Sequence, residues 1–146
     1  MGRPDTLRAG SNPIVCFTDA PTDTLLDVRC YHQSFAPLIY ESRRLHQSGL
    51  PDSAVEARML EEIRSGKLRA PSGATAGYRV LGPMRGYDPV TGQLGPSLDR
   101  WQSIHVPFAT TETLGIGTSE HGTEPFMMAS GTWWAHVMVM EQPLRY

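Results

Sequence analysis

Two of the five histidines, His105 and His136, lie in segments of the sequence that have β-strand character. On neighbouring strands, directly opposed side chains have Cβ atoms ~4.5 to 5.5 Å apart, so the two imidazoles could meet on one face of a sheet. Such a pair suits a proton relay or a divalent metal site such as a zinc centre, which needs at least three protein ligands. The alternative is a pair of hydrogen-bonded core histidines. The available third ligands are His32, His121, Glu120, Asp88 or another carboxylate.

Aromatic and methionine side chains are concentrated in the same half of the chain. They provide apolar, adaptable surface that could line a ligand pocket, and packing in an ordinary core is the alternative. We expect His136 at the exposed floor of such a pocket with His105 nearby, walls from residues 78–101, and a cover from residues 119–122. The candidate binding residues are His136, His105, His121, Trp134, Trp101 and Tyr78, and the methionines near the C-terminus are Met127, Met128, Met138 and Met140.

Motifs of nucleophilic and nucleotide chemistry are missing from the sequence. Ser130-Gly131 precedes a predicted strand, whereas the serine of a nucleophile elbow precedes a helix. Gly115-Ile116-Gly117 opens no predicted helix, as a dinucleotide-binding turn must. The sequence therefore leaves open whether the protein is an enzyme, and the only cofactor that it suggests is a divalent metal held by His105 and His136.

The composition is typical of one soluble domain, spanning residues 1–146. The chain is 40% hydrophobic and 19% charged, with a net charge of −2, and its 13 basic residues show no basic face for nucleic acid. Its apolar runs are far shorter than the ~20 residues of a transmembrane helix. The residues after Met1 lack the apolar core of a signal peptide. We therefore expect neither a nucleic-acid partner nor a transmembrane segment, and a small molecule or another protein is the expected partner.

The two cysteines, Cys16 and Cys30, are 14 positions apart. This spacing matches neither a zinc site nor a redox dithiol. A disulfide and two free buried thiols are both compatible with the residues alone. A bridge would stabilise the fold by ~3 kcal/mol through the loop-closure entropy of the unfolded chain.

Two helices are predicted in the first half of the chain. Apolar residues recur at helical spacing over residues 34–48, and Gly49 ends the pattern. Ser53 and Glu56 match a capping box, so a second helix of about 12 residues is predicted to begin at Ser53. Its predicted apolar face consists of Val55, Met59, Leu60 and Ile63, with Glu61 and Glu62 on the opposite face.

Short segments with strand character dominate the second half. The last of them, residues 133–140, alternates between two largely apolar faces, which predicts an interior strand covered on both sides. A long turn-rich loop is expected between Gly82 and Asp99. The fold class is therefore predicted to be α+β, with a small mixed or antiparallel sheet in the C-terminal half and two helices packed on it. The predicted strands are residues 14–18, 77–81, 103–108, 126–129 and 133–140.

Four blocks of the chain together resemble an uncharacterised bacterial protein family whose members are usually exported. The resemblance extends from about Leu7 to Val139, and no activity is known for the family. The blocks are Leu7-Arg8-Ala9-Gly10-Ser11-Asn12 followed by Val15-Cys16; Tyr78, Leu81, Gly82 and Asp88-Pro89; Ile104-His105-Val106; and Pro125-Phe126-Met127-Met128 through Gly131-Thr132-Trp133-Trp134-Ala135-His136-Val137-Met138-Val139. The third block departs from the family pattern at Ile104 and Pro107, and the fourth at Trp133.

The resemblance implies a periplasmic or secreted protein whose signal peptide is absent from this chain; if Met1 is the native start, a cytoplasmic protein is expected instead. Export in turn implies a disulfide between Cys16 and Cys30, with Cα atoms ~4.4 to 6.8 Å apart. The expected function is that of a small-molecule-binding or accessory domain with a histidine and aromatic pocket. The alternatives are a metal-dependent hydrolase or lyase centred on His105 and His136, and a structural subunit of a larger complex.

Overall fold

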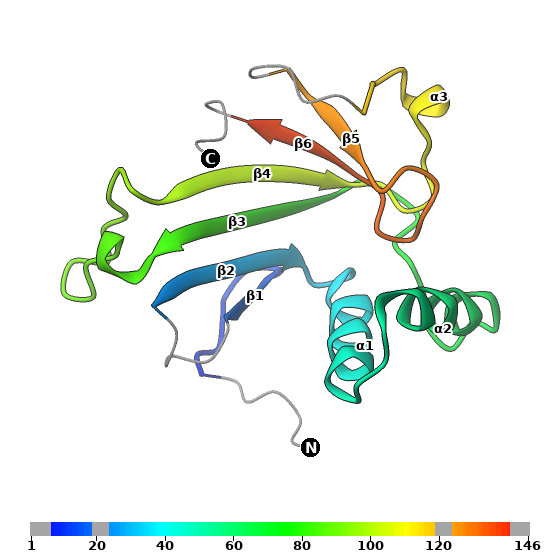
Figure 1. The fold of residues 1–146 in the computed structure, drawn as a ribbon, viewed down its shortest axis with the longest axis horizontal. Coiled ribbons are helices and arrows are strands. Elements are labelled where there is room, and N and C mark those ends of the chain that lie inside the picture. Colours follow the sequence, from blue (N-terminus) through cyan, green and yellow to red (C-terminus); the bar gives the residue numbers. More distant parts are fainter. Residues whose placement is uncertain (1–6, 19–23, 119–123, 141–146) are drawn as a thin grey trace.

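The computed structural model describes residues 7–18, 24–118 and 124–140. In this part of the chain, six strands form one antiparallel sheet in the order β1-β2-β3-β4-β6-β5, and two longer helices lie beside it (Figure 1). The predicted α+β fold is confirmed. The elements are β1 (Ile14–Thr18), β2 (Leu25–His32), α1 (Ala36–Gln47), α2 (Asp52–Arg64), β3 (Thr75–Pro83), β4 (Asp99–His105), α3 (Thr111–Leu114), β5 (Phe126–Met128) and β6 (His136–Met140).

Strand β2 was not predicted, and it extends the sheet beyond the C-terminal half of the chain. It pairs with β1 on one side and with β3 on the other. Charged residues interrupt the apolar alternation in the sequence of this strand. One of them, Asp27, is buried in the sheet, where it accepts hydrogen bonds from Arg29 and from Arg79 of β3. A carboxylate can be buried when guanidinium groups pair with it. One of these groups belongs to Arg79, which lies 52 positions from Asp27 in the sequence. The sheet predicted in the C-terminal half therefore extends into the N-terminal half through β1 and β2.

Strand β6 lies between β4 and β5, so its predicted interior position is confirmed. It begins at His136 instead of Trp133, and β4 ends at His105 instead of Phe108. The chain between these strand ends turns sharply, since Phe108, Ala129 and Gly131 all have positive φ angles. Left-handed conformations of this kind interrupt a strand. Trp133 and Trp134 consequently belong to a turn that leads into β6.

Helices α1 and α2 pack at the end of the sheet where β2 ends (Figure 1). The apolar face predicted for the first helix is confirmed, because Phe35, Leu38, Ile39 and Leu45 are all buried. On α2, Val55 and Met59 are buried, whereas Leu60 and Ile63 are only partly buried. Together with Phe17, Tyr31 and Trp133, these side chains form the main hydrophobic core.

The start of α2 differs from the prediction. The helix begins at Asp52 after Pro51, and no side chain caps it. The Glu56 carboxylate instead accepts a hydrogen bond from Nε1 of Trp133 at 2.7 Å. The predicted capping box is therefore wrong, because a residue 77 positions away binds the carboxylate that the box would have used.

Glu62 was predicted on the exposed side of α2, but its side chain is only 2% exposed. Its Oε1 atom accepts hydrogen bonds from Nζ of Lys67 at 2.6 Å and from Nε of Arg58 at 3.1 Å. Two cations therefore neutralise the buried carboxylate, which explains how an acidic residue can occupy this position.

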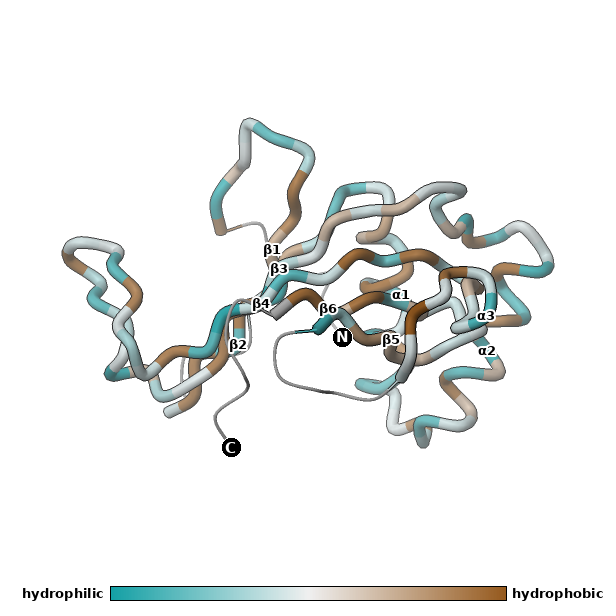
Figure 2. The backbone as a smooth tube through the Cα atoms, turned by 90° about the horizontal axis from the view of Figure 1, so that it is seen from above, coloured by the Kyte–Doolittle hydropathy of each residue, from teal (hydrophilic) through white to brown (hydrophobic). Residues whose placement is uncertain are grey.

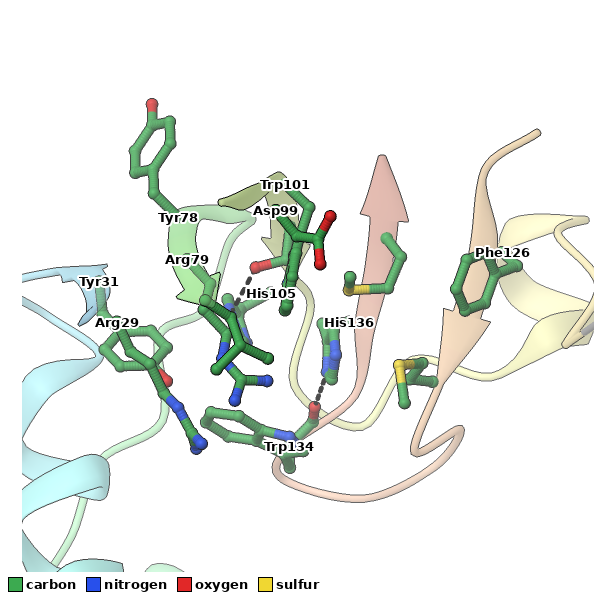
Figure 3. Close-up of a pocket in the computed structure, with 14 residues that line it drawn as sticks. Arg29, Tyr31, Tyr78, Arg79, Asp99, Trp101, His105, Phe126, Trp134 and His136 are labelled. Atoms are coloured by element: carbon green, nitrogen blue, oxygen red, sulfur yellow. Dashed lines mark hydrogen bonds between the residues drawn. The ribbon is translucent and has the colours of Figure 1, made fainter. Parts of the chain in front are cut away.

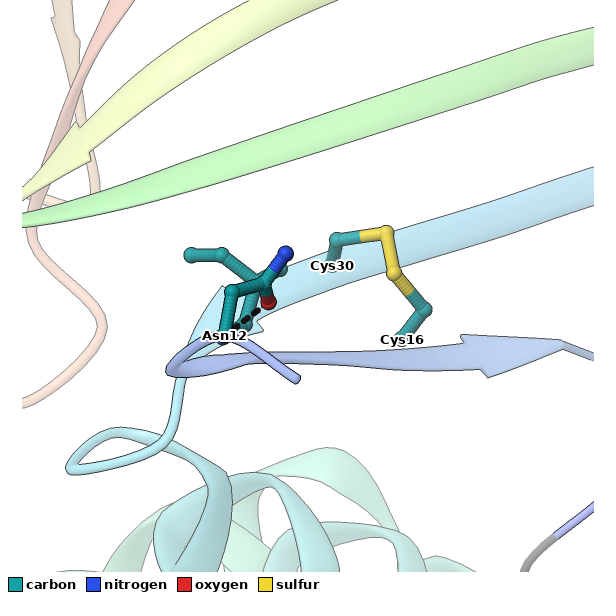
Figure 4. Close-up of a disulfide and its surroundings, with 4 residues drawn as sticks. Asn12, Cys16 and Cys30 are labelled. Atoms are coloured by element: carbon teal, nitrogen blue, oxygen red, sulfur yellow. Dashed lines mark hydrogen bonds between the residues drawn. A yellow bond between two sulfur atoms is a disulfide. The ribbon is translucent and has the colours of Figure 1, made fainter. Parts of the chain in front are cut away.

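Cys16 and Cys30 form a disulfide between β1 and β2 (Figure 4). Their Cα atoms are 3.9 Å apart, which is shorter than the predicted range. The two residues are directly opposed in the strand register, where Cα atoms approach to ~4.5 Å even without a bridge. Just before β1, the side chain of Asn12 accepts a hydrogen bond from the amide of Ile14 at 3.0 Å.

The residues between β3 and β4 form the predicted turn-rich loop, which projects from the rest of the chain on the left of Figures 1 and 2. Tyr87 and Leu94 form an isolated β-bridge in it. The Asp88 carboxylate accepts hydrogen bonds from the amide of Val90 and the hydroxyl of Thr91. Among the described helices, none combines the length and the apolar character that crossing a membrane requires.

Candidate functional site

One face of the sheet carries a pocket of about 510 Å³, lined by side chains from five strands and from the turn before β6 (Figure 3). Strand pairing brings these residues together in rows that cross the sheet. One row runs from Arg29 through Arg79 to Trp101. The next row includes Tyr31, Ser103, Met138 and Phe126, and the one after it includes His105, His136 and Met128. Residues far apart in the sequence thus form one continuous surface.

The two candidate histidines lie side by side in this surface. His105 of β4 and His136 of β6 are directly opposed, and their ring centroids are 5.0 Å apart. His105 is 1% exposed and His136 is 6% exposed, so the expectation of an exposed floor residue is wrong. The rings of Phe35 and Trp134 lie 4.6 Å and 5.0 Å from that of His105, which accounts for its burial.

Each histidine makes one hydrogen bond through a ring nitrogen. Nδ1 of His136 donates to the carbonyl oxygen of Trp134 at 2.7 Å, so Nε2 carries the lone pair when the ring is neutral. Nε2 of His105 is 3.0 Å from the hydroxyl of Ser103 (Figure 3). The other nitrogen of His105 is buried and has no hydrogen-bond partner among the described residues. One imidazole is therefore oriented by the backbone and the other by a serine.

Burial keeps both histidines neutral. It lowers the pKa of His105 from 6.5 to about 3, and the neighbouring His136 adds to this shift. Burial also lowers the pKa of His136, although the hydrogen bond to the Trp134 carbonyl opposes the change. A buried imidazole without an anionic partner loses more by taking up a proton than one in water. At neutral pH the pair therefore acts as uncharged hydrogen-bonding and lone-pair groups.

Gly77 makes this arrangement possible from the neighbouring strand. A Cβ atom at this position would lie 2.5 Å from Oγ of Ser103 and 2.7 Å from Nε2 of His105. Those distances are far below van der Waals contact, so any side chain would displace the two groups. The glycine thus leaves the space in which the Ser103–His105 hydrogen bond forms.

Charged groups lie beside the apolar part of the pocket. Nε and Nη2 of Arg79 both donate to Asp27 at 2.8 Å, and Arg29 binds the same carboxylate. These bonds hold the pKa of Asp27 well below its usual range against the opposing effect of burial. The guanidinium group of Arg79 also lies 5.0 Å from the ring centroid of Trp101. The pairing fixes the position of both arginines, and Asp99 adds a carboxylate to the same wall.

The remaining predicted binding residues are placed differently from one another. Trp101 and Trp134 line the pocket. Tyr78 borders it, but its ring points away from the other lining side chains, because alternation along β3 turns it to the opposite face beside Cys30 (Figure 3). His121 and the proposed cover at residues 119–122 lie outside the described residues.

The described residues contain no group of three histidine, cysteine or acidic side chains that could hold a metal ion. His32 is hydrogen-bonded to Ser34, and Asp88 is engaged in the turn between β3 and β4. Neither joins His105 and His136. A divalent metal held by the two histidines with a third hard ligand stays a prediction, because Glu120 and His121 lie outside the described residues.

Sequence reasoning missed the charged wall of the pocket and two of its central residues. Arg29 and Tyr31 belong to the strand that was not predicted. Arg79 and Ser103 lie on predicted strands, and their alternation with Tyr78 and Gln102 would have placed them on one face. Pairing partners could not be assigned without the strand order.

Comparison with known proteins does not assign the chain to a family. No family model matches the chain, and no curated protein or solved structure is detectably similar to it.

Proposed function

We propose that this protein binds a small organic molecule with a flat, apolar body in the pocket on its sheet. The observation that carries the proposal is the pocket itself. About 510 Å³ of space is retained on a face where aromatic side chains would otherwise pack together. Ligand pockets of small molecules typically have ~300 to 1,000 Å³ and combine apolar walls with a few polar groups.

The shape of the ligand follows from the rings around the space. Phe126 and Trp101 form one apolar side, where they pack with Met138. Trp134 lies on the other side and makes an edge contact with His136, with ring centroids 5.5 Å apart. Aromatic rings interact best with other flat groups in offset-stacked or edge-to-face arrangements. A planar ring system is therefore the body that these walls favour.

Polar groups at two places would orient such a ligand. Ser103 and His105 offer a neutral hydrogen-bonding pair at the base of the pocket. Arg79 and Asp99 supply one positive and one negative charge along the wall. Because Arg79 is already held by Asp27, it would lose little conformational freedom on contacting a ligand.

The proposal includes export of the protein to the periplasm or the medium. The Cys16–Cys30 disulfide supports this compartment, because disulfides persist in oxidising environments and are rare in the cytosol. The family resemblance, which stays a prediction, supports it as well. The hydrolase or lyase and the structural subunit also stay predictions, without an observation that favours either.

Binding can be tested with two flat probes, neutral indole and anionic 2-naphthoate, by ligand-observed NMR. The wild type should show saturation transfer to at least one probe. Replacing the pocket residue Leu81 by tryptophan should fill part of the space and abolish this transfer. Val80→Trp is the matched control, because Val80 lies on the same strand but on the opposite face.

The two variants distinguish binding in the pocket from nonspecific binding to the protein surface. Transfer that is retained in Val80→Trp and lost in Leu81→Trp supports the proposal. Equal transfer in the wild type and in Leu81→Trp would contradict it. Stronger transfer to 2-naphthoate than to indole would indicate that Arg79 contacts an anionic group.

A further inference from the structure

Two methionines flank His136 on the pocket face. Met128 of β5 is directly opposed to His136, and Met138 follows it two positions later on β6. Both methionines line the pocket together with the histidine. Directly opposed residues have Cβ atoms ~4.5 to 5.5 Å apart, and residues two positions apart on one strand are separated by ~7 Å. Two thioethers and one imidazole therefore lie within reach of a common point.

The lone pair of His136 is available for a ligand. Its Nδ1 atom donates to the Trp134 carbonyl, which leaves Nε2 as the unprotonated nitrogen of the neutral ring. A hydrogen bond from the second ring nitrogen to a backbone carbonyl is the usual support of a metal-binding histidine, because it fixes the tautomer and the ring orientation. The structure thus already holds the imidazole in the form that binds a cation.

The donor set selects for a soft cation. Thioethers are soft ligands that favour Cu(I), whereas hard divalent ions favour carboxylates. Of the two carboxylates that the described residues place near the pocket, Asp27 is bound by two arginines. Asp99 lies six residues from His105 along β4, which corresponds to ~20 Å. Both cysteines of the chain are bonded to each other, so neither offers a competing thiolate.

The two sulfur donors differ in their access to solvent. Met138 is buried, whereas Met128 is 45% exposed, which leaves a route for an ion to enter from solvent.

We propose that His136, Met138 and Met128 form a binding site for a soft monovalent cation, Cu(I) or its analogue Ag(I). The site lies at the β5–β6 end of the pocket. It goes beyond the proposed binding of an organic molecule, because it uses nitrogen and sulfur donors that such a ligand does not need. Either proposal can fail without the other.

The test is a titration of the full chain with Ag(I), under non-reducing conditions in chloride-free buffer, after labelling the methionine methyl groups with ¹³C. We expect the methyl signals of Met128 and Met138 to shift and to saturate at one equivalent. Met127 is the internal control, because it neighbours Met128 on β5 but points to the opposite face. Its methyl signal should move little, and one equivalent of Zn(II) should leave the signals of Met128 and Met138 unchanged.

Leucine variants then measure the contribution of each sulfur. Met138→Leu and Met128→Leu keep the side-chain size, and each should weaken Ag(I) binding at least tenfold in competition with a chelator of known affinity. Met127→Leu should bind Ag(I) like the wild type. Unchanged circular dichroism in each variant will confirm that the fold is retained.

Three results would overturn the proposal. The first is the absence of stoichiometric Ag(I) binding by the wild type. The second is undiminished binding after replacement of both Met128 and Met138. The third is an equal shift of their methyl signals by Zn(II), which would show a site without preference for soft cations. Loss of 2-naphthoate binding in Leu81→Trp with retained Ag(I) binding would show that the two proposals concern different sites.

Discussion

The two ends of one sheet face carry similar aromatic side chains, but one end is packed core and the other borders a pocket. At the β1–β2 end, Phe17 lies in the core that α1 and α2 cover, and Tyr31 belongs both to this core and to the edge of the pocket. Toward β5, Trp101, Phe126 and Met138 pack together beside open space. We call the first the helix-covered region and the second the pocket region. The comparison shows that aromatic composition does not decide between core and pocket; coverage by the helices does.

Phe35 joins the two regions. It is fully buried at the start of α1, and its ring lies 4.6 Å from that of His105 and 6.3 Å from that of Trp133. Phe35→Ala should therefore cause the largest effect, a loss of ~3 to 5 kcal/mol in the free energy of unfolding. Urea denaturation measures it. A loss below ~1 kcal/mol would show that the two regions are not packed through this ring.

The disulfide should stabilise the helix-covered region without affecting the pocket. Replacing both Cys16 and Cys30 by serine should lower the stability by ~3 kcal/mol, because the unfolded chain regains the entropy of a short loop. The bridge lies on the face that also carries Tyr78, opposite the pocket. Probe binding by the folded double variant should consequently stay unchanged. A matching loss of probe binding would contradict the separation of the two faces.

Glu62 sharpens the account of α2. Glu62→Ala should destabilise the protein by ~1 to 3 kcal/mol, because it removes the buried partner of Lys67 and Arg58. Glu61→Ala is the control on the same helix, and its exposed side chain predicts a change of ~0.5 kcal/mol or less. Thermal unfolding of both variants measures the two losses of stability. Equal small losses of stability in the two variants would show that Glu62 lies on the solvent-exposed face, as the sequence predicted.

The buried histidines also impose a pH dependence on the stability of the pocket region. The pKa of His105 is about 3 in the folded protein and near 6.5 when unfolded, so the unfolded state binds more protons between these values. Stability from His105 is present above pH 6.5 and is lost as the pH falls toward 3, by up to ~1.4 kcal/mol per pH unit.

Urea denaturation between pH 7 and pH 4.5 isolates this contribution, since the lowered pKa of Asp27 acts at more acidic pH. The variant His105→Gln should lose stability less steeply than the wild type over this range. The remaining histidines are common to both proteins and cancel in the comparison. Parallel curves would show that His105 is not buried in its neutral form.

Features with local causes were predictable from the sequence. The apolar face of α1 followed from helical spacing, and the shared face of His105 and His136 required only that two neighbouring strands alternate. Features that depend on distant partners were not predictable. Asp27 can be buried in a strand because Arg79 pairs with it. Glu56 does not cap α2, and its carboxylate instead accepts a hydrogen bond from Trp133.

The candidate site divides in the same way. Trp134 could be placed near the histidines from the sequence, since it belongs to the predicted strand that contains His136. Trp101 comes two residues before the predicted strand that contains His105. Tyr78 was assigned to the pocket because of its type, although alternation with Arg79 turns its ring to the other face. The arginine wall could not be found without the pairing of β2 with β3.

The central claim is that the pocket region binds a ligand whereas the helix-covered region is packed core. The chain has three tryptophans, which report on both regions: Trp101 and Trp134 line the pocket, and Trp133 is buried against Glu56. A titration with 2-naphthoate, followed by the ¹⁵N–¹H signals of the three indoles, tests the claim directly. We predict saturable shifts of the Trp101 and Trp134 signals that exceed the shift of Trp133. A Trp133 signal that moves most, or three signals that stay fixed at saturating probe, would contradict the account.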